Sequence, residues 1–162
     1  MCPSRRQTVA LISFVALVAS ACSSGQASPS PASAVPSATT AGAATVQVTL
    51  QEWAVVPASS SAVAGQLTFQ VRNSGPADVH EFVVLKTDLD PGSLPVDANG
   101  AVTESGTGIE VIDEIEDIPV GETQDLTVAL TAGKYVLLCN IYSVDEKEAH
   151  YKLGMRVAFD VQ

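Results

Sequence analysis

Hydrophobic and polar residues alternate in several short runs of the chain from position 45 onward. Val46, Val48 and Leu50 alternate with polar neighbours, and the same two-residue period recurs at 67–72 and 126–130. Successive side chains of a β-strand point to opposite faces, so this period predicts strands with one buried and one exposed face.

Other runs predict strands in the interior of a sheet. The segment 81–86 presents apolar residues to both faces, as a central strand does. A tight turn at 131–133 precedes a returning strand at 134–139. The last strand turns its apolar residues inward, at Val157, Phe159 and Val161.

The segment 88–118 differs from these runs in composition. It contains Gly, Pro, Asn and Ser, and we expect an extended connection with one strand at 109–112. A helical turn or two within this segment is the only helix that we expect. Residues 45–162 are therefore predicted to form one all-β domain, of a size that can enclose a core.

The N-terminal segment 1–21 has the features of a secretory signal. Arg5 and Arg6 form a basic region, and the apolar run 9–19 is too short to span a bilayer. Three small residues precede Cys22, which resembles the lipobox of bacterial lipoproteins. This resemblance implies that Cys22 carries a lipid that anchors the mature protein to the outer face of the cytoplasmic membrane. A plain cleaved signal with an incidental Cys is the alternative.

The segment 22–44 predicts a disordered tether. After Cys22 it consists almost entirely of Ser, Ala, Pro, Thr, Gly and Gln, with no charged residue. Such a composition cannot bury enough apolar surface to offset the backbone entropy lost on folding. We expect this segment to act as a spacer between the membrane and the domain.

Four residues of the predicted domain can bind a transition metal through nitrogen or sulfur. They are His80, Cys139, His150 and Met155, and the remaining Cys and Met residues all fall in the N-terminal segments. Strand period places His80, Cys139 and Met155 on the core side, near strand ends. A lone thiol in an oxidising compartment has no disulfide partner, so metal binding is one way to protect it. Singly, each residue also has an ordinary interpretation, as a buried Cys, a surface His or a core Met.

This combination of ligands favours copper. A soft thiolate, two imidazoles and a weak thioether suit an ion that cycles between two oxidation states. Zinc rarely takes a thioether as its fourth ligand and prefers Cys, His or carboxylate. We therefore predict one mononuclear copper site.

The segment 45–162 resembles the cupredoxins, the small blue-copper proteins that include plastocyanin, azurin and sulfocyanin. Three motifs carry the similarity: a His after an Asn-Gly turn (Asn73, Gly75, His80), a turn-strand-Cys element (Gly133, Tyr135, Cys139), and a His followed by Gly-Met (His150, Gly154, Met155).

The resemblance implies a Greek-key β-sandwich or barrel with a type 1 copper site. In that site His80 and His150 would bind through ring nitrogens, Cys139 through its thiolate and Met155 axially. Two features depart from the family's pattern. His150 follows Cys139 by eleven positions, in a loop with four charged residues, and Glu81 stands where many relatives carry an Asn that braces the site.

Charge narrows the choice of partners. The net charge of −10 argues against nucleic acid, whose phosphates attract basic proteins. The densest acidic cluster comprises Glu110, Asp113, Glu114, Glu116 and Asp117. This cluster could steer a basic redox partner, and ordinary solvated surface charge is the alternative. We expect a monomer whose partner is a basic or membrane-bound redox protein.

An electron carrier fits these residues better than an enzyme. Two His residues are too few for a multicopper oxidase, one available Cys is too few for a binuclear copper site, and no Ser-His-Asp set is recognisable. The alternatives are a protein that stores or delivers copper and, in third place, a metal-free structural module. Trp53 and Tyr142 are interpreted as packing residues, with Tyr142 also a candidate for the docking face.

Overall fold

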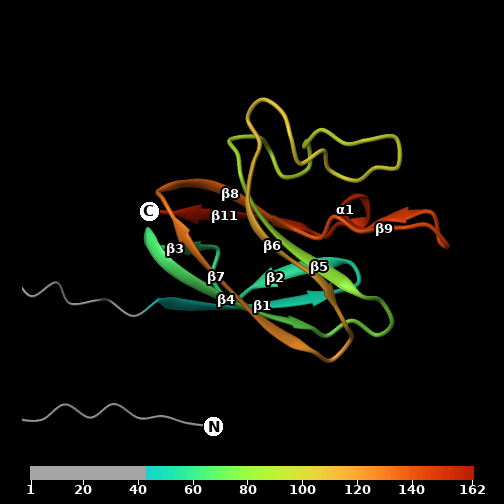
Figure 1. The fold of residues 1–162 in the computed structure, drawn as a ribbon, viewed down its shortest axis with the longest axis horizontal. Helices are drawn as coiled ribbons and strands as arrows, with labels where there is room; N and C mark the ends of the chain where they lie inside the picture. Colours follow the sequence, from blue (N-terminus) through green and yellow to red (C-terminus); the bar gives the residue numbers. More distant parts are fainter. Residues whose placement is uncertain (1–42) are drawn as a thin grey trace, which may run out of the picture. The chain divides into compact units, whose positions relative to one another are not determined.

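The computed structural model describes residues 43–162, which form two β-sheets and a small hairpin (Figure 1). The predicted signal at 1–21, Cys22 and all but the last two positions of the tether lie outside these residues. Within 43–162, no helix is long and apolar enough to cross a membrane.

The first sheet contains four strands in the order β2-β1-β4-β7. Its strands are β1 (Ala44–Gln51), β2 (Ala54–Pro57), β4 (Gly65–Asn73) and β7 (Thr123–Leu130). β1 and β4 run parallel, whereas the other neighbours are antiparallel.

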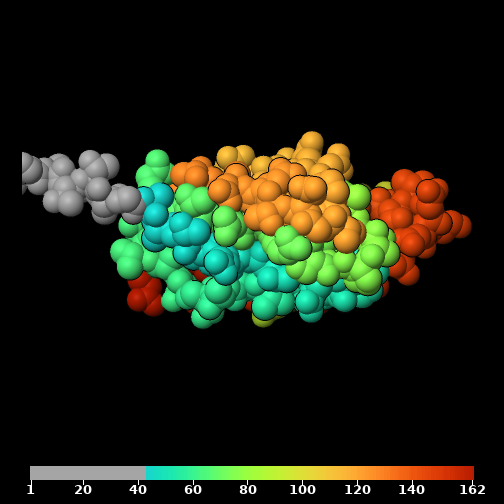
Figure 2. Space-filling model, turned by 90° about the horizontal axis from the view of Figure 1, so that it is seen from below, coloured from blue at the N-terminus to red at the C-terminus, as the bar shows by residue number. Residues whose placement is uncertain are grey.

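The second sheet contains five strands in the order β3-β11-β8-β5-β6. Its strands are β3 (Ser61–Ala62), β5 (His80–Lys86), β6 (Glu110–Ile118), β8 (Gly133–Leu138) and β11 (Arg156–Val161). The hairpin of β9 (Tyr142–Ser143) and β10 (Glu148–Ala149) is followed directly by the short helix α1 (His150–Leu153). Figure 2 shows the part of the chain around the hairpin, in orange-red, at one end of the domain.

The main core lies between the two sheets. The alternating runs of β1 and β4 bury their apolar positions as the sequence predicts, and the ring of Phe69 packs against Phe82 and Phe159 at centroid distances of 5.3 and 5.5 Å. Burying each such ring contributes about 1.5–3 kcal/mol to folding. The prediction of an all-β sandwich is confirmed.

The central strands β5 and β8 are buried on both faces, as the sequence predicts for 81–86. Phe82 and Leu137 face the main core, whereas Val83 and Leu138 face a second core on the outer side of the sheet. The connection 87–109 covers this second core, and Figure 1 shows it arching over that sheet.

One prediction for the segment 88–118 is wrong, and another is correct but too short. Its residues form no helix, and the short helix of the described residues lies at His150–Leu153 instead. The strand predicted at 109–112 is β6, which continues to Ile118. β6 pairs only with β5, so it is an edge strand whose outer face is free to carry charge. Its acidic residues and two register shifts against β5 hide the alternation that identifies other strands.

Tyr151 fastens the connection 87–109 to the sheet. Its hydroxyl donates to the carbonyl of Pro91 at 2.7 Å and accepts from the backbone N–H of Leu94 at 3.1 Å. The guanidinium of Arg156 stacks over its ring at 4.8 Å. Tyr151, which directly follows the predicted ligand His150, thus holds the connection 87–109 over the second core.

We predict that Tyr151→Phe lowers the free energy of unfolding by about 1–3 kcal/mol, because it leaves the buried N–H of Leu94 and the carbonyl of Pro91 without a partner. Denaturant unfolding of residues 43–162 measures this. Tyr142→Phe, in the half-buried strand β9, is the control and should change the free energy by less than about 0.5 kcal/mol. Equal effects of the two substitutions would contradict the anchoring role of Tyr151.

Candidate metal centre

Hydrogen bonds of the Asn73 side chain fix the turn that leads into His80. The Asn73 amide donates to the carbonyls of Asp78 and Ile118 at 2.8 and 2.9 Å, and its oxygen accepts from the N–H of Gly75 at 2.9 Å. These bonds satisfy buried backbone groups that no strand neighbour reaches. They place His80 at the first position of β5, at the end of the sandwich.

Backbone hydrogen bonds hold the other three predicted ligands together. The N–H of Cys139 donates to the carbonyl of Met155 at 3.0 Å, and the N–H of Met155 donates to the carbonyl of His150 at 3.1 Å. The N–H of His150 donates in turn to Ile141 at 2.9 Å. The loop between Cys139 and His150 therefore begins and ends at the same end of the sandwich.

Gly154 is needed where this segment turns back into β11. Its φ of 131° is a conformation that glycine adopts readily and other residues avoid. A Cβ at this position would also lie 2.9 Å from the carbonyl oxygen of Trp53. The backbone conformation and the close contact with Trp53 thus explain why the Gly-Met motif has a glycine at position 154.

The structure brings His80, Cys139 and His150 together around one point. The two Nδ1 atoms lie 3.3 Å apart, and the Cys139 sulfur lies 3.4 Å from Nδ1 of His150. Two nitrogens bound to one ion at roughly 2.0–2.1 Å would be about 3.3–3.6 Å apart, by simple geometry. All three side chains are buried, so the residues present fit one small metal ion.

Met155 lies fully buried in the same core cluster as Cys139. Its backbone bonds to Cys139 and His150 fix it beside the other three residues. The four residues predicted from the sequence therefore gather at one end of the sandwich. That they act as ligands stays a prediction.

Solved structures of other proteins share this arrangement of strands. The domain superposes on an auracyanin from Roseiflexus castenholzii with a TM-score of 0.51 and 22% identity, covering 75% of this chain and 99% of that one. It superposes on auracyanin A from Chloroflexus aurantiacus, described as a "blue" copper protein, with a TM-score of 0.50 and 19% identity, covering 75% and 100% of the two chains.

The domain has the cupredoxin fold. No family model and no curated protein matches the sequence, so the fold is shown by structure. The prediction made from the Asn-Gly, Cys and Gly-Met motifs is confirmed at the level of fold.

Burial sets the protonation of the predicted ligands in this domain. Burial lowers the pKa of His80, with a further contribution from His150, and burial also lowers the pKa of His150. Burial raises the pKa of Cys139 to about 12, against the backbone N–H of Glu81 that donates to its sulfur at 3.3 Å. The imidazoles are therefore ready to bind a metal, whereas the thiol must release its proton to do so.

Sequence reasoning missed two residues of this site. The ring of Trp53, predicted only to pack, meets the rings of His150 and His80 edge-on at centroid distances of 4.8 and 6.3 Å. The carboxylate of Glu52 lies 3.8 Å from Nε2 of His80. Both residues lie between β1 and β2, and nothing in the local pattern links them to a His almost thirty positions away.

Glu81, the predicted departure from the cupredoxin pattern, belongs to a carboxylate cluster with Glu104 and Glu114. Burial, together with the charges of Glu114 and Glu104, raises the pKa of Glu81 to about 7. Charging Glu81 is therefore unfavourable in the folded domain.

We predict that Glu81→Gln stabilises the metal-free domain at pH 8 but not at pH 4. The folded pKa of about 7 lies above the ordinary value of 4.5, so the cost of the charge is absent below pH 4.5, grows up to pH 7 and is complete above it. Denaturant unfolding across this range measures the difference from wild type. Glu110→Gln, at an exposed position on the neighbouring strand β6, is the control. A stabilisation that does not vary with pH would contradict the assignment.

Proposed function

We propose that residues 43–162 form a mononuclear type 1 copper protein that carries single electrons. The observation that best supports this proposal is a buried cluster around Nδ1 of His150. Nδ1 of His80 lies 3.3 Å from this atom, and the sulfur of Cys139 lies 3.4 Å from it. Met155 would complete the set of residues that hold the copper, and the copper would supply a one-electron couple. Two imidazoles, one thiolate and a weak thioether are the ligand set of blue-copper centres.

The surroundings of the site favour electron transfer over copper storage or delivery. His80, Cys139 and Met155 are fully buried, and the Trp53 ring packs against both His rings. An ion enclosed in this way exchanges slowly with a recipient protein. The backbone bonds between the ligand residues also resist movement when the charge of the site changes, which suits an electron carrier better than an enzyme.

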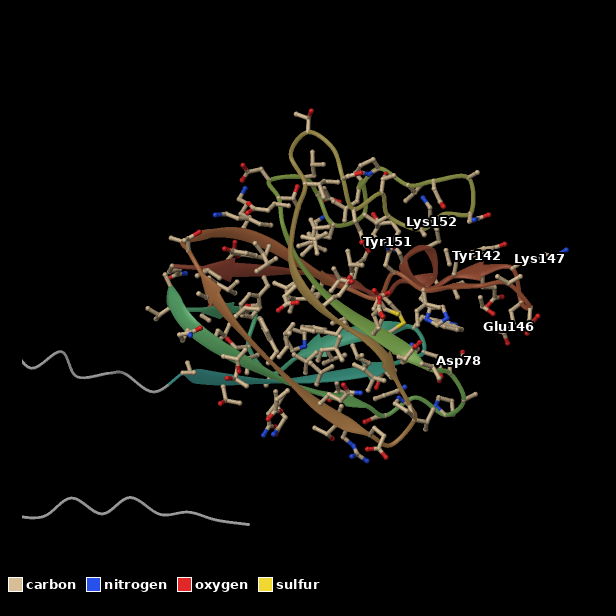
Figure 3. All side chains as sticks on the ribbon, viewed as in Figure 1. Asp78, Tyr142, Glu146, Lys147, Tyr151 and Lys152 are labelled. Atoms are coloured by element: carbon tan, nitrogen blue, oxygen red, sulfur yellow. The ribbon has the colours of Figure 1, made fainter. Side chains whose placement is uncertain are left out.

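An acidic surface at this end favours a basic redox partner. A shallow pocket of about 250 Å³ over His150 is lined in part by Asp78, Asp117 and Glu146. Figure 3 shows Asp78 and Glu146 at the same end of the domain. Negative charge around an electron-entry point attracts a positively charged protein and orients its approach.

Substituting the thiolate tests the proposal directly. We predict that copper-loaded wild type has an intense visible absorption and that Cys139→Ser removes it without unfolding the domain, because the band arises from charge transfer between thiolate and copper. Met155→Leu, which removes the other buried sulfur of the site, is the matched variant. It should keep the colour while shifting the reduction potential. Absorption, spin-resonance spectra and circular dichroism measure these outcomes. A wild type that binds Cu(II) without colour would overturn the electron-carrier function.

We also propose that Cys22 carries a lipid and holds the domain on the outer face of the cytoplasmic membrane. The small residues before Cys22 and the uncharged segment after it support this. We predict that Cys22→Ser moves the expressed protein from the membrane fraction to the soluble fraction and abolishes labelling with a radioactive fatty acid. Ser23→Ala is the control and should stay with the membrane. Membrane retention of unlabelled Cys22→Ser would contradict the lipid anchor.

A further inference from the structure

The two nitrogens of His80 have different surroundings. Nδ1 lies in the candidate metal centre, 3.3 Å from Nδ1 of His150. Nε2 is buried and makes no hydrogen bond within residues 43–162. If Nδ1 binds a metal, Nε2 must carry the ring proton, and a buried N–H without an acceptor is unfavourable.

Glu52 places a carboxylate beside this nitrogen. Its side chain is only 10% exposed, and Oε1 lies 3.8 Å from Nε2 of His80. Oε1 accepts the backbone N–H groups of Asp78 and Ala77 at 2.8 and 3.2 Å, which hold the carboxylate in place. Oε2 is buried and makes no hydrogen bond within residues 43–162. The carboxylate therefore has one buried oxygen without a partner, and its other oxygen lies 3.8 Å from the unused Nε2 of His80.

Gly75 makes room for this carboxylate. A Cβ at position 75 would lie 2.6 Å from Oε1 of Glu52, closer than two such atoms can approach. The Asn-Gly turn that delivers His80 thus also accommodates Glu52. The contact couples a residue between β1 and β2 to the start of β5.

We infer that Glu52 is a positioning residue of the metal centre: its carboxylate accepts the Nε2 proton of His80 and holds the ring as the tautomer whose Nδ1 is free to bind copper. The inference rests on the proposed copper site. A hydrogen bond requires the two groups to approach by less than about 1 Å. A carboxylate behind a metal-binding imidazole fixes its orientation and raises its basicity.

The negative charge of Glu52 has a consequence for the redox couple. A more basic imidazole and a nearby anion stabilise the higher charge of Cu(II) more than that of Cu(I). Glu52 therefore lowers the reduction potential of the site. A backbone carbonyl in the same place would orient the ring but would not add a full charge.

Two substitutions test this role. Glu52→Gln keeps an oxygen for the N–H groups of Asp78 and Ala77 but removes the charge. Gly75→Ala keeps the charge but displaces the carboxylate. We predict that Glu52→Gln weakens Cu(II) binding roughly tenfold relative to Cu(I), which corresponds to a potential raised by about 59 mV, and that Gly75→Ala shifts the potential in the same direction. Voltammetry of the copper-loaded domain measures both.

A control separates this specific contact from the general effect of charge. Glu146→Gln removes a negative charge from the pocket beside His150 and should shift the potential less than Glu52→Gln. In the Cu(I) form, nuclear magnetic resonance should show a slowly exchanging Nε2 proton on His80 in wild type and Glu146→Gln. This proton should exchange faster or change its chemical shift in Glu52→Gln.

The outcomes distinguish this inference from the proposed function. If wild type binds copper with the expected colour but Glu52→Gln and Gly75→Ala match Glu146→Gln in potential and in the His80 proton signal, the role of Glu52 is overturned and the copper site stands. If wild type does not bind copper, both are overturned. A Glu52→Gln protein that fails to fold leaves Gly75→Ala to decide.

Discussion

The candidate metal centre depends on two backbone hydrogen bonds, from Cys139 to Met155 and from Met155 to His150. They bring the start and the end of a long loop to one place and fix three of the four predicted ligands relative to one another. Side-chain contacts alone would need to order each residue separately, at a cost in conformational entropy for every rotamer. Here the strand ends of β8 and β11 already provide that order.

Different interactions place His80 at the same site. It begins β5, which is hydrogen-bonded to β8, and the hydrogen bonds of the Asn73 side chain fix the turn before it. Because β5 and β8 are buried on both faces, neither strand can slip by one residue without exchanging the side chains that fill the two cores. The register that buries Phe82 and Leu137 is therefore the same register that brings His80 to Cys139.

The sequence allowed the fold and the four central residues to be predicted because both leave periodic or exclusive signals. Strand alternation shows in β1, β4 and β7, and the domain contains only two His and one Cys. The length of β6 was not predictable, because an edge strand with a charged face loses its alternation. Glu52 and Trp53 escaped notice because their meaning comes from a contact across the sandwich, and a single Glu or Trp after a strand is ordinary.

The hairpin of β9 and β10 separates the length of the Cys139–His150 loop from the spacing of the ligands. Ser143 pairs with Glu148 and Tyr142 with Ala149, so the chain is closed again before it reaches α1. Residues beyond these pairs, at 144–147, project from the end of the domain and make no demand on the positions of the rings and the sulfur. Insertions or deletions at this tip would thus alter the recognition surface while the centre beneath it stays the same, which lets one scaffold acquire new partners by changing a few exposed positions.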